Sequence, residues 1–172
     1  LLRYLALRTL ADQRLPVFLE LKTVSEADFK HARNNLADLL FEKVIADVLH
    51  LQEEEHYRFK EYFFARLAVG QVAIFLDGLD EVTGTNFFPE LCTAVGKFAS
   101  SNYRNNRLVI STRPYALQAR LEGLKEMEIA SLTHGPIEEF LGHYYGDDDT
   151  TRRFLRNLRR NRSLRELCRV PF

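Results

Sequence analysis

Hydrophobic and polar residues follow two kinds of pattern along this chain. Short apolar runs predict β-strands at residues 16–21, 72–76 and 108–112, and a fourth at residues 127–130. The run at 72–76 has five consecutive apolar residues, which is typical of a strand buried on both faces of a sheet.

Between these runs, apolar residues recur at helical spacing. This spacing predicts helices at residues 1–12, 36–51, 57–69, 87–98, 137–145, 151–159 and 163–168. Strands that alternate with helices indicate an α/β fold, with a parallel sheet covered on both faces. After about Leu132 only helices are expected, so we place residues 1–131 in an α/β core and residues 132–172 in the beginning of a helical domain.

Carboxylates gather directly after the run at 72–76. Asp77 follows its last apolar residue, and Asp80 and Glu81 come within the next four positions. Open α/β sheets bind ligands at the carboxyl ends of their strands. There, Asp77 could hold a Mg²⁺ that bridges nucleotide phosphates, and Asp80 or Glu81 could orient or deprotonate a water. The alternative is that these acids cap a turn and face solvent.

The run at 108–112 is followed by Arg113. If its strand lies parallel and next to the strand at 72–76, Arg113 and Asp77 emerge at the same edge of the sheet. A guanidinium matches phosphate oxygens with two parallel hydrogen bonds, so Arg113 could sense or neutralise an outer phosphate. A plain Asp77–Arg113 ion pair would explain the same pattern without a ligand.

Together, the runs FLDGLDE and ISTRP resemble the NACHT domain of the STAND class of P-loop NTPases. That family has an extended Walker B motif, matched here by the apolar residues 73–76, Asp77, a small and an apolar residue, and then Asp80 and Glu81. The resemblance implies that Asp77 coordinates Mg²⁺, that Asp80 and Glu81 are the hydrolytic acids, and that Arg113 is the sensor-1 arginine. It also implies a three-layer sheet of the P-loop NTPase type.

The resemblance extends over nearly the whole chain. Residues 16–21 with Lys22 look like the second strand of that fold, and residues 129–141 are similar to the entry into the family's first helical domain. Near the end of the chain, Pro171 corresponds to a proline that packs against adenine in the family. A simple helix breaker would explain Pro171 equally well.

One family motif is missing. The phosphate loop Gly-x-x-x-x-Gly-Lys-Ser/Thr occurs nowhere in these 172 residues, although in the family it directly precedes a helix much like residues 1–6. The chain also lacks an initiator Met, so we expect that it was cut from a longer protein, which removed the first strand and the loop. A degenerate domain is the alternative. Because the loop supplies backbone N–H groups and a lysine to the phosphates, these residues alone are predicted to bind ATP poorly and hydrolyse none.

Composition changes this picture little. Hydrophobic residues make up 46% and charged residues 28%, which excludes a disordered tail or a disulfide scaffold. Lys+Arg and Asp+Glu are equal at 24 each, but residues 152–169 carry eight arginines against one glutamate. The leucines among these arginines favour amphipathic helices with a solvated basic face over a nucleic-acid contact. Two cysteines without a spacing pattern indicate a reducing compartment, and no apolar run is long enough to span a bilayer.

The resemblance thus implies part of a cytoplasmic NACHT signalling switch in immune or stress responses. In such a switch, ATP and ADP, bound with Mg²⁺, control oligomerisation through NACHT domains, and the full-length protein is an ATPase. Two alternatives stay open: a NACHT-like interaction scaffold that does not hydrolyse ATP, and a P-loop ATPase that acts on nucleic acid.

Overall fold

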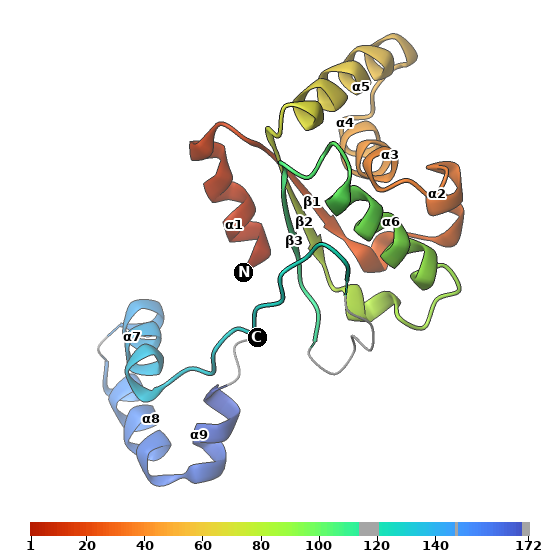
Figure 1. The fold of residues 1–172 in the computed structure, drawn as a ribbon. Helices are drawn as coiled ribbons and strands as arrows, with labels where there is room; N and C mark the ends of the chain where they lie inside the picture. The colour runs from red at the N-terminus through yellow and green to blue at the C-terminus, as the bar shows by residue number, and fades with distance from the viewer. Residues whose placement is uncertain (114–120, 147, 170–172) are drawn as a thin grey trace. The chain divides into compact units, whose positions relative to one another are not determined.

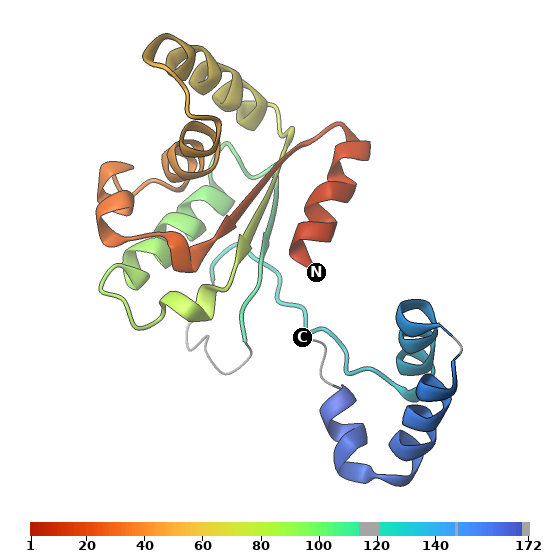
Figure 2. The same ribbon diagram turned by 180° about the vertical axis from the view of Figure 1, so that it is seen from behind.

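A computed structural model describes residues 1–113, 121–146 and 148–169. The chain divides into two compact units, Leu1–Lys125 and Glu126–Phe172. This division falls a few residues before the boundary expected after Ser131. Figures 1 and 2 show the elements of the units from opposite sides.

The first unit is built on three parallel strands (Figure 1). They are β1 (Leu15–Glu20), β2 (Val72–Asp77) and β3 (Arg107–Ile110), and they lie in the order β1-β2-β3. The expected α/β fold with a parallel sheet is confirmed, and all three strands lie within two residues of their predicted bounds. Residues 72–76 of the central strand are at most 1% exposed, as expected for a strand covered on both faces.

Helices connect the strands of the first unit. The α-helices are α1 (Leu2–Arg8), α2 (Glu26–His31), α3 (Leu36–Leu40), α4 (Asp47–Leu49), α5 (Glu53–Ala68) and α6 (Phe88–Ser100). Short 3₁₀ helices occur at Thr9–Asp12, Leu21–Thr23 and Leu79–Val82, and a π-helix at Phe41–Ala46. The single helix expected over 36–51 is therefore interrupted, because the π-helix separates α3 from α4.

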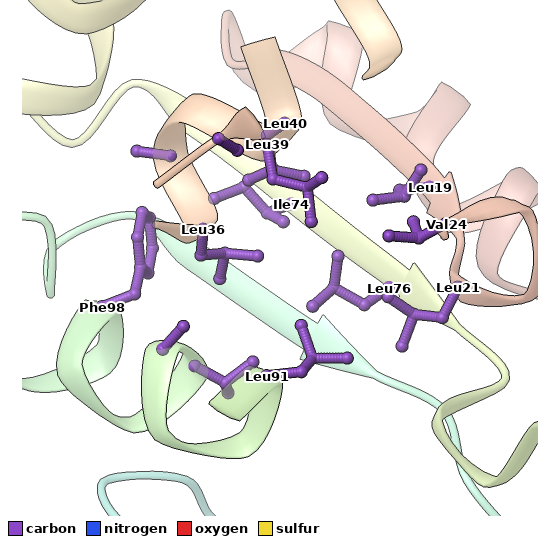
Figure 3. Close-up of a cluster of buried hydrophobic side chains, with 14 of the residues drawn as sticks. Leu19, Leu21, Val24, Leu36, Leu39, Leu40, Ile74, Leu76, Leu91 and Phe98 are labelled. Carbon is purple, nitrogen blue, oxygen red and sulfur yellow. The ribbon is translucent and has the colours of Figure 1, made fainter. Parts of the chain in front are cut away.

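The sheet is the middle layer of the first unit. Along β2, Val72, Ile74 and Leu76 belong to the larger apolar cluster, which also contains side chains of α3, α5 and α6. Figure 3 shows Ile74 and Leu76 together with labelled side chains of α3 and α6. On the other face, Ala73 and Phe75 pack with residues of α1. Fully burying an aliphatic or aromatic side chain stabilises a fold by about 1.5–3 kcal/mol, so both faces contribute to holding β2 in place.

The strand expected at residues 127–130 is wrong. The structure has no strand there, and the side chains of Met127 and Ile129 are 80% and 60% exposed. An isolated extended segment has no neighbouring strand to pair its N–H and C=O groups, so water must satisfy them. Apolar residues do alternate in this segment, but it pairs with no strand of the sheet that the described residues form.

The second unit contains the expected helices, α7 (His134–Tyr145), α8 (Asp149–Arg160) and α9 (Arg162–Arg169). Asp148 caps α8, because its carboxylate accepts the Thr151 N–H at 2.7 Å. An ion pair between Arg159 and Glu138 connects α8 to α7. Throughout the described ranges, every helix is too short or too polar to cross a membrane.

A capping box begins α2. The Ser25 hydroxyl accepts the Asp28 N–H at 3.1 Å, and the Asp28 carboxylate accepts the Ser25 N–H at 2.9 Å. We expect Ser25→Ala to lower the free energy of unfolding at neutral pH by about 1 kcal/mol, the usual cost of losing an N-cap. Urea unfolding measures this loss.

The same capping box makes the loss dependent on pH. Hydrogen bonds from the Ser25 hydroxyl and N–H, with nearby Lys43, lower the pKa of Asp28 below its ordinary value. Its stabilising effect is therefore complete above the unfolded pKa, about 3.9, and is lost as the pH falls through the folded pKa. The difference between wild type and Ser25→Ala should shrink below about pH 4. Thr133→Ala is the control, because Thr133 precedes α7 without a side-chain cap bond. An equal loss in both variants would contradict the prediction.

Candidate functional site

The carboxyl ends of the three strands form one edge of the sheet. The register pairs Glu20 of β1 with Asp77 of β2, and Leu76 of β2 with Ile110 of β3, so the strands end at the same level. Strand β2, which ends in Asp77, and β3, which is followed by Ser111, are parallel neighbours. The sequence-based hypothesis of a shared site required this arrangement. Ligands of parallel sheets bind at this kind of edge.

Ser111 holds Asp77 in place. The Ser111 hydroxyl donates to Asp77 Oδ1 and accepts the Gly78 N–H at 2.9 Å. The Ser111 backbone donates its N–H to Leu76 O and accepts the Leu79 N–H, both at 2.9 Å. The end of β3 is therefore bound to the turn after β2, while Asp77 Oδ2 accepts no hydrogen bond from the described residues. The sequence analysis missed this role of Ser111.

The turn after Asp77 depends on a glycine. Gly78 has φ +75° and ψ +51°, in the left-handed region, and its C=O accepts the Glu81 N–H at 3.0 Å. A Cβ on Gly78 would lie 3.0 Å from the Glu81 carboxyl group. The Glu81 side chain thus folds back over Gly78, beside the end of β2.

Gly78→Ala should therefore disturb this turn. The left-handed conformation costs an L-residue about 1–2 kcal/mol, and the added Cβ would also displace the Glu81 carboxyl group. We expect a loss of about 1–2 kcal/mol in the free energy of unfolding, measured in urea. Gly84→Ala is the matched control, because its φ is not positive and an added Cβ meets nothing within 4 Å. Equal stability of the two variants would refute the assignment of strain to Gly78.

Arg113 pairs with Asp80 instead of Asp77. Its Nε lies 3.2 Å from Asp80 Oδ2, and its backbone N–H donates to Asp80 Oδ1 at 3.3 Å. The Asp80 side chain is only 13% exposed, whereas that of Arg113 is 65% exposed. The Asp77–Arg113 ion pair considered from the sequence is thus replaced by an Asp80–Arg113 pair. The reason is that Ser111 already bonds Asp77, and the turn at Gly78 carries Asp80 toward the end of β3.

A second group of charges, also missed in the sequence, lies at the same edge. Lys22 Nζ is 3.1 Å from Glu20 Oε2, and Arg3 pairs with the same carboxylate. The hydrogen bond to Glu20, and then the charges of Glu20, Glu81 and Asp77, raise the pKa of Lys22. The Lys22 ammonium thus lies within electrostatic reach of both site acids. In the sequence, the position of Lys22 directly after a predicted strand could have indicated that it lies at this edge of the sheet.

The beginning of α1 lies at this edge too. Arg3, in the first turn of α1, reaches Glu20 at the carboxyl end of β1. Alternation along β2 places Asp77 on the face that carries Ala73 and Phe75, which is the face that α1 covers. The partial positive charge at the start of a helix is therefore on the same side of the sheet as Asp77.

The donor set at this edge fits a shared Mg²⁺. Mg²⁺ binds oxygen ligands, and proteins usually hold it through one or two carboxylates while phosphates and waters complete the shell. Asp77 offers one oxygen that no described residue occupies. Among the described residues, no three His, Cys, Asp or Glu side chains gather as a metal site. The arrangement suits an ion held jointly with a phosphate ligand.

Two further residues, Pro171 and Cys92, add nothing to this geometry. Pro171, the candidate adenine contact, lies outside the described residues. Cys92 is a half-buried free thiol whose pKa is raised by burial, and it belongs to α6. Neither residue extends the site at the sheet edge.

Comparisons with models of protein families, with curated proteins and with solved structures find no match to this chain. The geometry of the sheet edge is therefore the support for a function. That geometry places one hydrogen-bonded carboxylate, one exposed guanidinium and one folded-back glutamate around the ends of two neighbouring strands.

Proposed function

We propose that this chain is part of a NACHT-type switch that binds ATP with Mg²⁺ and hydrolyses it in the full-length protein. The observation that carries the proposal is the convergence of Asp77, Asp80, Glu81 and Arg113 at the carboxyl ends of β2 and β3. The P-loop NTPase type of fold is part of the proposal. In that fold the phosphate loop directly precedes α1, whose first turn lies beside Glu20.

Asp77 is the residue that would hold Mg²⁺. An ion held by Asp77 would supply positive charge where negative charge develops on the phosphates during phosphoryl transfer. Ser111 supports this role, because its hydrogen bond fixes Asp77 Oδ1, while Oδ2 accepts no hydrogen bond from the described residues. A preoriented ligand loses less conformational freedom when the ion binds.

Arg113 would bind the outer phosphate. Its guanidinium is largely exposed and its Nε pairs with Asp80, and a guanidinium presents further N–H donors that suit phosphate oxygens. Water around the exposed guanidinium weakens this ion pair, whereas a bidentate contact with a doubly charged phosphate is among the strongest hydrogen-bonded ion pairs. Arg113 can therefore move from Asp80 to the nucleotide.

Glu81 is the better candidate for the general base. Arg113 engages both Asp80 oxygens, because its backbone N–H donates to Oδ1 and its side chain forms an ion pair with Oδ2. Glu81 is exposed at the surface and its carboxyl group lies over Gly78, next to the metal ligand. A base needs a free lone pair within reach of the attacking water. We therefore assign proton transfer to Glu81 and the positioning of Arg113 to Asp80.

The Arg113–Asp80 pair supplies the two states that a switch needs. With ATP bound, Arg113 holds the outer phosphate and Asp80 loses its partner. After hydrolysis and phosphate release, the pair forms again. A ligand shifts a conformational equilibrium only through different contacts in the two states, and this exchange provides such a difference. In the full-length protein, the exchange would control self-association.

Calorimetric titration of the full-length protein with ATP, in the presence of Mg²⁺ or of a chelator, tests the proposal. We expect Mg²⁺-dependent binding, and we expect Asp77→Ala to abolish nucleotide-dependent oligomerisation measured by light scattering. Asp12→Ala is the matched control, because Asp12 is an exposed carboxylate that pairs with Arg107 at the opposite edge of the sheet. A full-length protein without affinity for ATP, or an Asp77→Ala variant that still oligomerises with nucleotide, would refute the proposal.

A further inference from the structure

Helix α8 has a face made of arginines. All five arginines of the helix are exposed, namely Arg152, Arg153, Arg156, Arg159 and Arg160. With 3.6 residues per turn, they fall within about a third of the helix circumference. Thr151 and Leu158, on the opposite side, are 6% and 0% exposed because they pack inside the second unit.

Three of these arginines carry uncompensated charge. Arg159 pairs with Glu138, whereas Arg153, Arg156 and Arg160 have no carboxylate within ion-pair distance among the described residues. Their spacing of i, i+3 and i+7 aligns them along the helix over roughly 10 Å, at 1.5 Å per residue. We call Arg153, Arg156 and Arg160 the arginine stripe.

The surroundings of the arginine stripe favour one class of partner. Stable protein interfaces centre on buried aromatic or aliphatic side chains, and this face of α8 has none. An amphipathic helix that lies on a membrane inserts its apolar side, but Leu158 is already buried in the unit. Interfaces with nucleic acids are instead polar and strongly positive, and guanidinium groups match phosphate oxygens.

We propose that the arginine stripe binds the phosphate backbone of a nucleic acid without sequence preference. The site lies in the second unit and does not depend on the proposed nucleotide switch. The sequence pattern alone favoured a merely solvated basic face. The structure adds that three arginines in one line have no carboxylate partner among the described residues, and that Thr151 and Leu158 on the opposite side are buried.

The proposal predicts how strongly the binding constant for nucleic acid depends on the salt concentration. Each neutralised phosphate contributes about −0.9 to the slope of log K against log salt for duplex DNA, and about −0.7 for single strands. Three contacts predict slopes of about −2.7 and about −2.1. Raising the salt from about 50 to about 200 mM should then weaken duplex binding by roughly 40-fold and single-strand binding by roughly 20-fold.

Fluorescence anisotropy of the full chain with a labelled mixed-sequence duplex, and with its single strand, tests this expectation. Arg153→Gln/Arg156→Gln/Arg160→Gln should lose the salt-dependent binding, and Arg156→Gln alone should reduce the duplex slope by about 0.9. The single variant keeps the test decisive if the triple variant unfolds. Arg58→Gln is the matched control, because Arg58 is an exposed arginine of α5 in the first unit, and its binding should equal wild type.

Three results would overturn the proposal. The first is the absence of salt-dependent binding by the wild-type chain. The second is an unchanged slope in both the single and the triple variant. The third is equal affinity for a polyglutamate peptide or for vesicles of anionic lipid, which would show that the stripe accepts any polyanion.

Discussion

Replacing Asn106 with alanine should lower the free energy of unfolding by roughly 3 kcal/mol. The Asn106 side chain is buried and makes three hydrogen bonds that connect separate elements. Its Oδ1 accepts the Val72 N–H at 2.9 Å, and its Nδ2 donates to Leu67 O and Tyr103 O, both at 2.8 Å. Alanine would leave the buried Val72 N–H without an acceptor, which costs about 1–3 kcal/mol. Leu67 O and Tyr103 O keep the backbone N–H groups of Gly70 and Asn106, so each loses only the side-chain hydrogen bond, worth about 1 kcal/mol.

Replacing Asn106 should also affect the candidate site, because this residue fixes where β2 and β3 begin relative to each other. It bonds the first residue of β2 and directly precedes β3, whose register runs from Ala73 opposite Arg107 to Leu76 opposite Ile110. The next residue, Ser111, is the one that holds Asp77. A buried side chain at the amino end of the sheet thus aligns the residues at the carboxyl end.

Urea unfolding of Asn106→Ala measures the loss, and two variants make it specific. Asn102→Ala changes an exposed asparagine of the preceding loop and should shift stability by less than about 0.5 kcal/mol. Asn106→Asp keeps an acceptor for Val72 but buries a carboxylate, whose folded pKa must then rise. Its stability should recover as the pH falls toward that raised pKa. A loss below about 0.5 kcal/mol in Asn106→Ala would contradict the role of this residue.

The sequence predicts the sheet well because strand burial is a local pattern. Five consecutive apolar residues are typical of a strand covered on both faces, and β2 is such a strand. Residues 127–130 show the limit of this argument. Their alternation is equally local, but a strand also needs a neighbour, and spacing alone cannot reveal that none is present.

Helix boundaries depend on features that apolar spacing does not contain. The stripe over residues 36–51 predicts one helix, yet a π-helix interrupts it at Phe41–Ala46. Helix α2 was not predicted, because its six residues are too short for a periodic signal. The pattern of Ser25 followed three residues later by Asp28 was its readable sign.

The sequence predicted most of the residues that form the candidate site, but it did not predict which acid forms the ion pair with Arg113. The sequence places Asp77 and Arg113 after neighbouring strands, and parallel pairing brings both to one edge. Which acid receives Arg113 depends on the left-handed conformation at Gly78, which directs the following residues toward β3. Ser111 joins the site only through its contact with Asp77 of the neighbouring strand, whereas Lys22 forms a local ion pair with Glu20 at the end of β1.

The two acids after Gly78 should differ strongly in function. In the full-length protein, we expect Glu81→Gln to lower kcat for ATP hydrolysis by about 10²–10⁴-fold, the usual contribution of a general base, with little change in ATP affinity. The amide keeps the shape of the side chain but cannot accept the proton of the attacking water. Steady-state hydrolysis and calorimetric binding separate these two effects. Glu54→Gln, an exposed glutamate in the first turn of α5, is the control.

Asp80→Asn should give the opposite result. The variant keeps the free Glu81 carboxylate, so its kcat should fall less than that of Glu81→Gln. The variant removes the negative charge that holds Arg113 Nε at 3.2 Å, in a pair whose guanidinium is exposed and whose carboxylate is largely buried. ATP binding should therefore tighten by a few-fold, because less energy is needed to release the guanidinium to the phosphate. If Asp80→Asn instead abolishes turnover while Glu81→Gln remains active, the base is Asp80, and Arg113 must leave it before the water can be deprotonated.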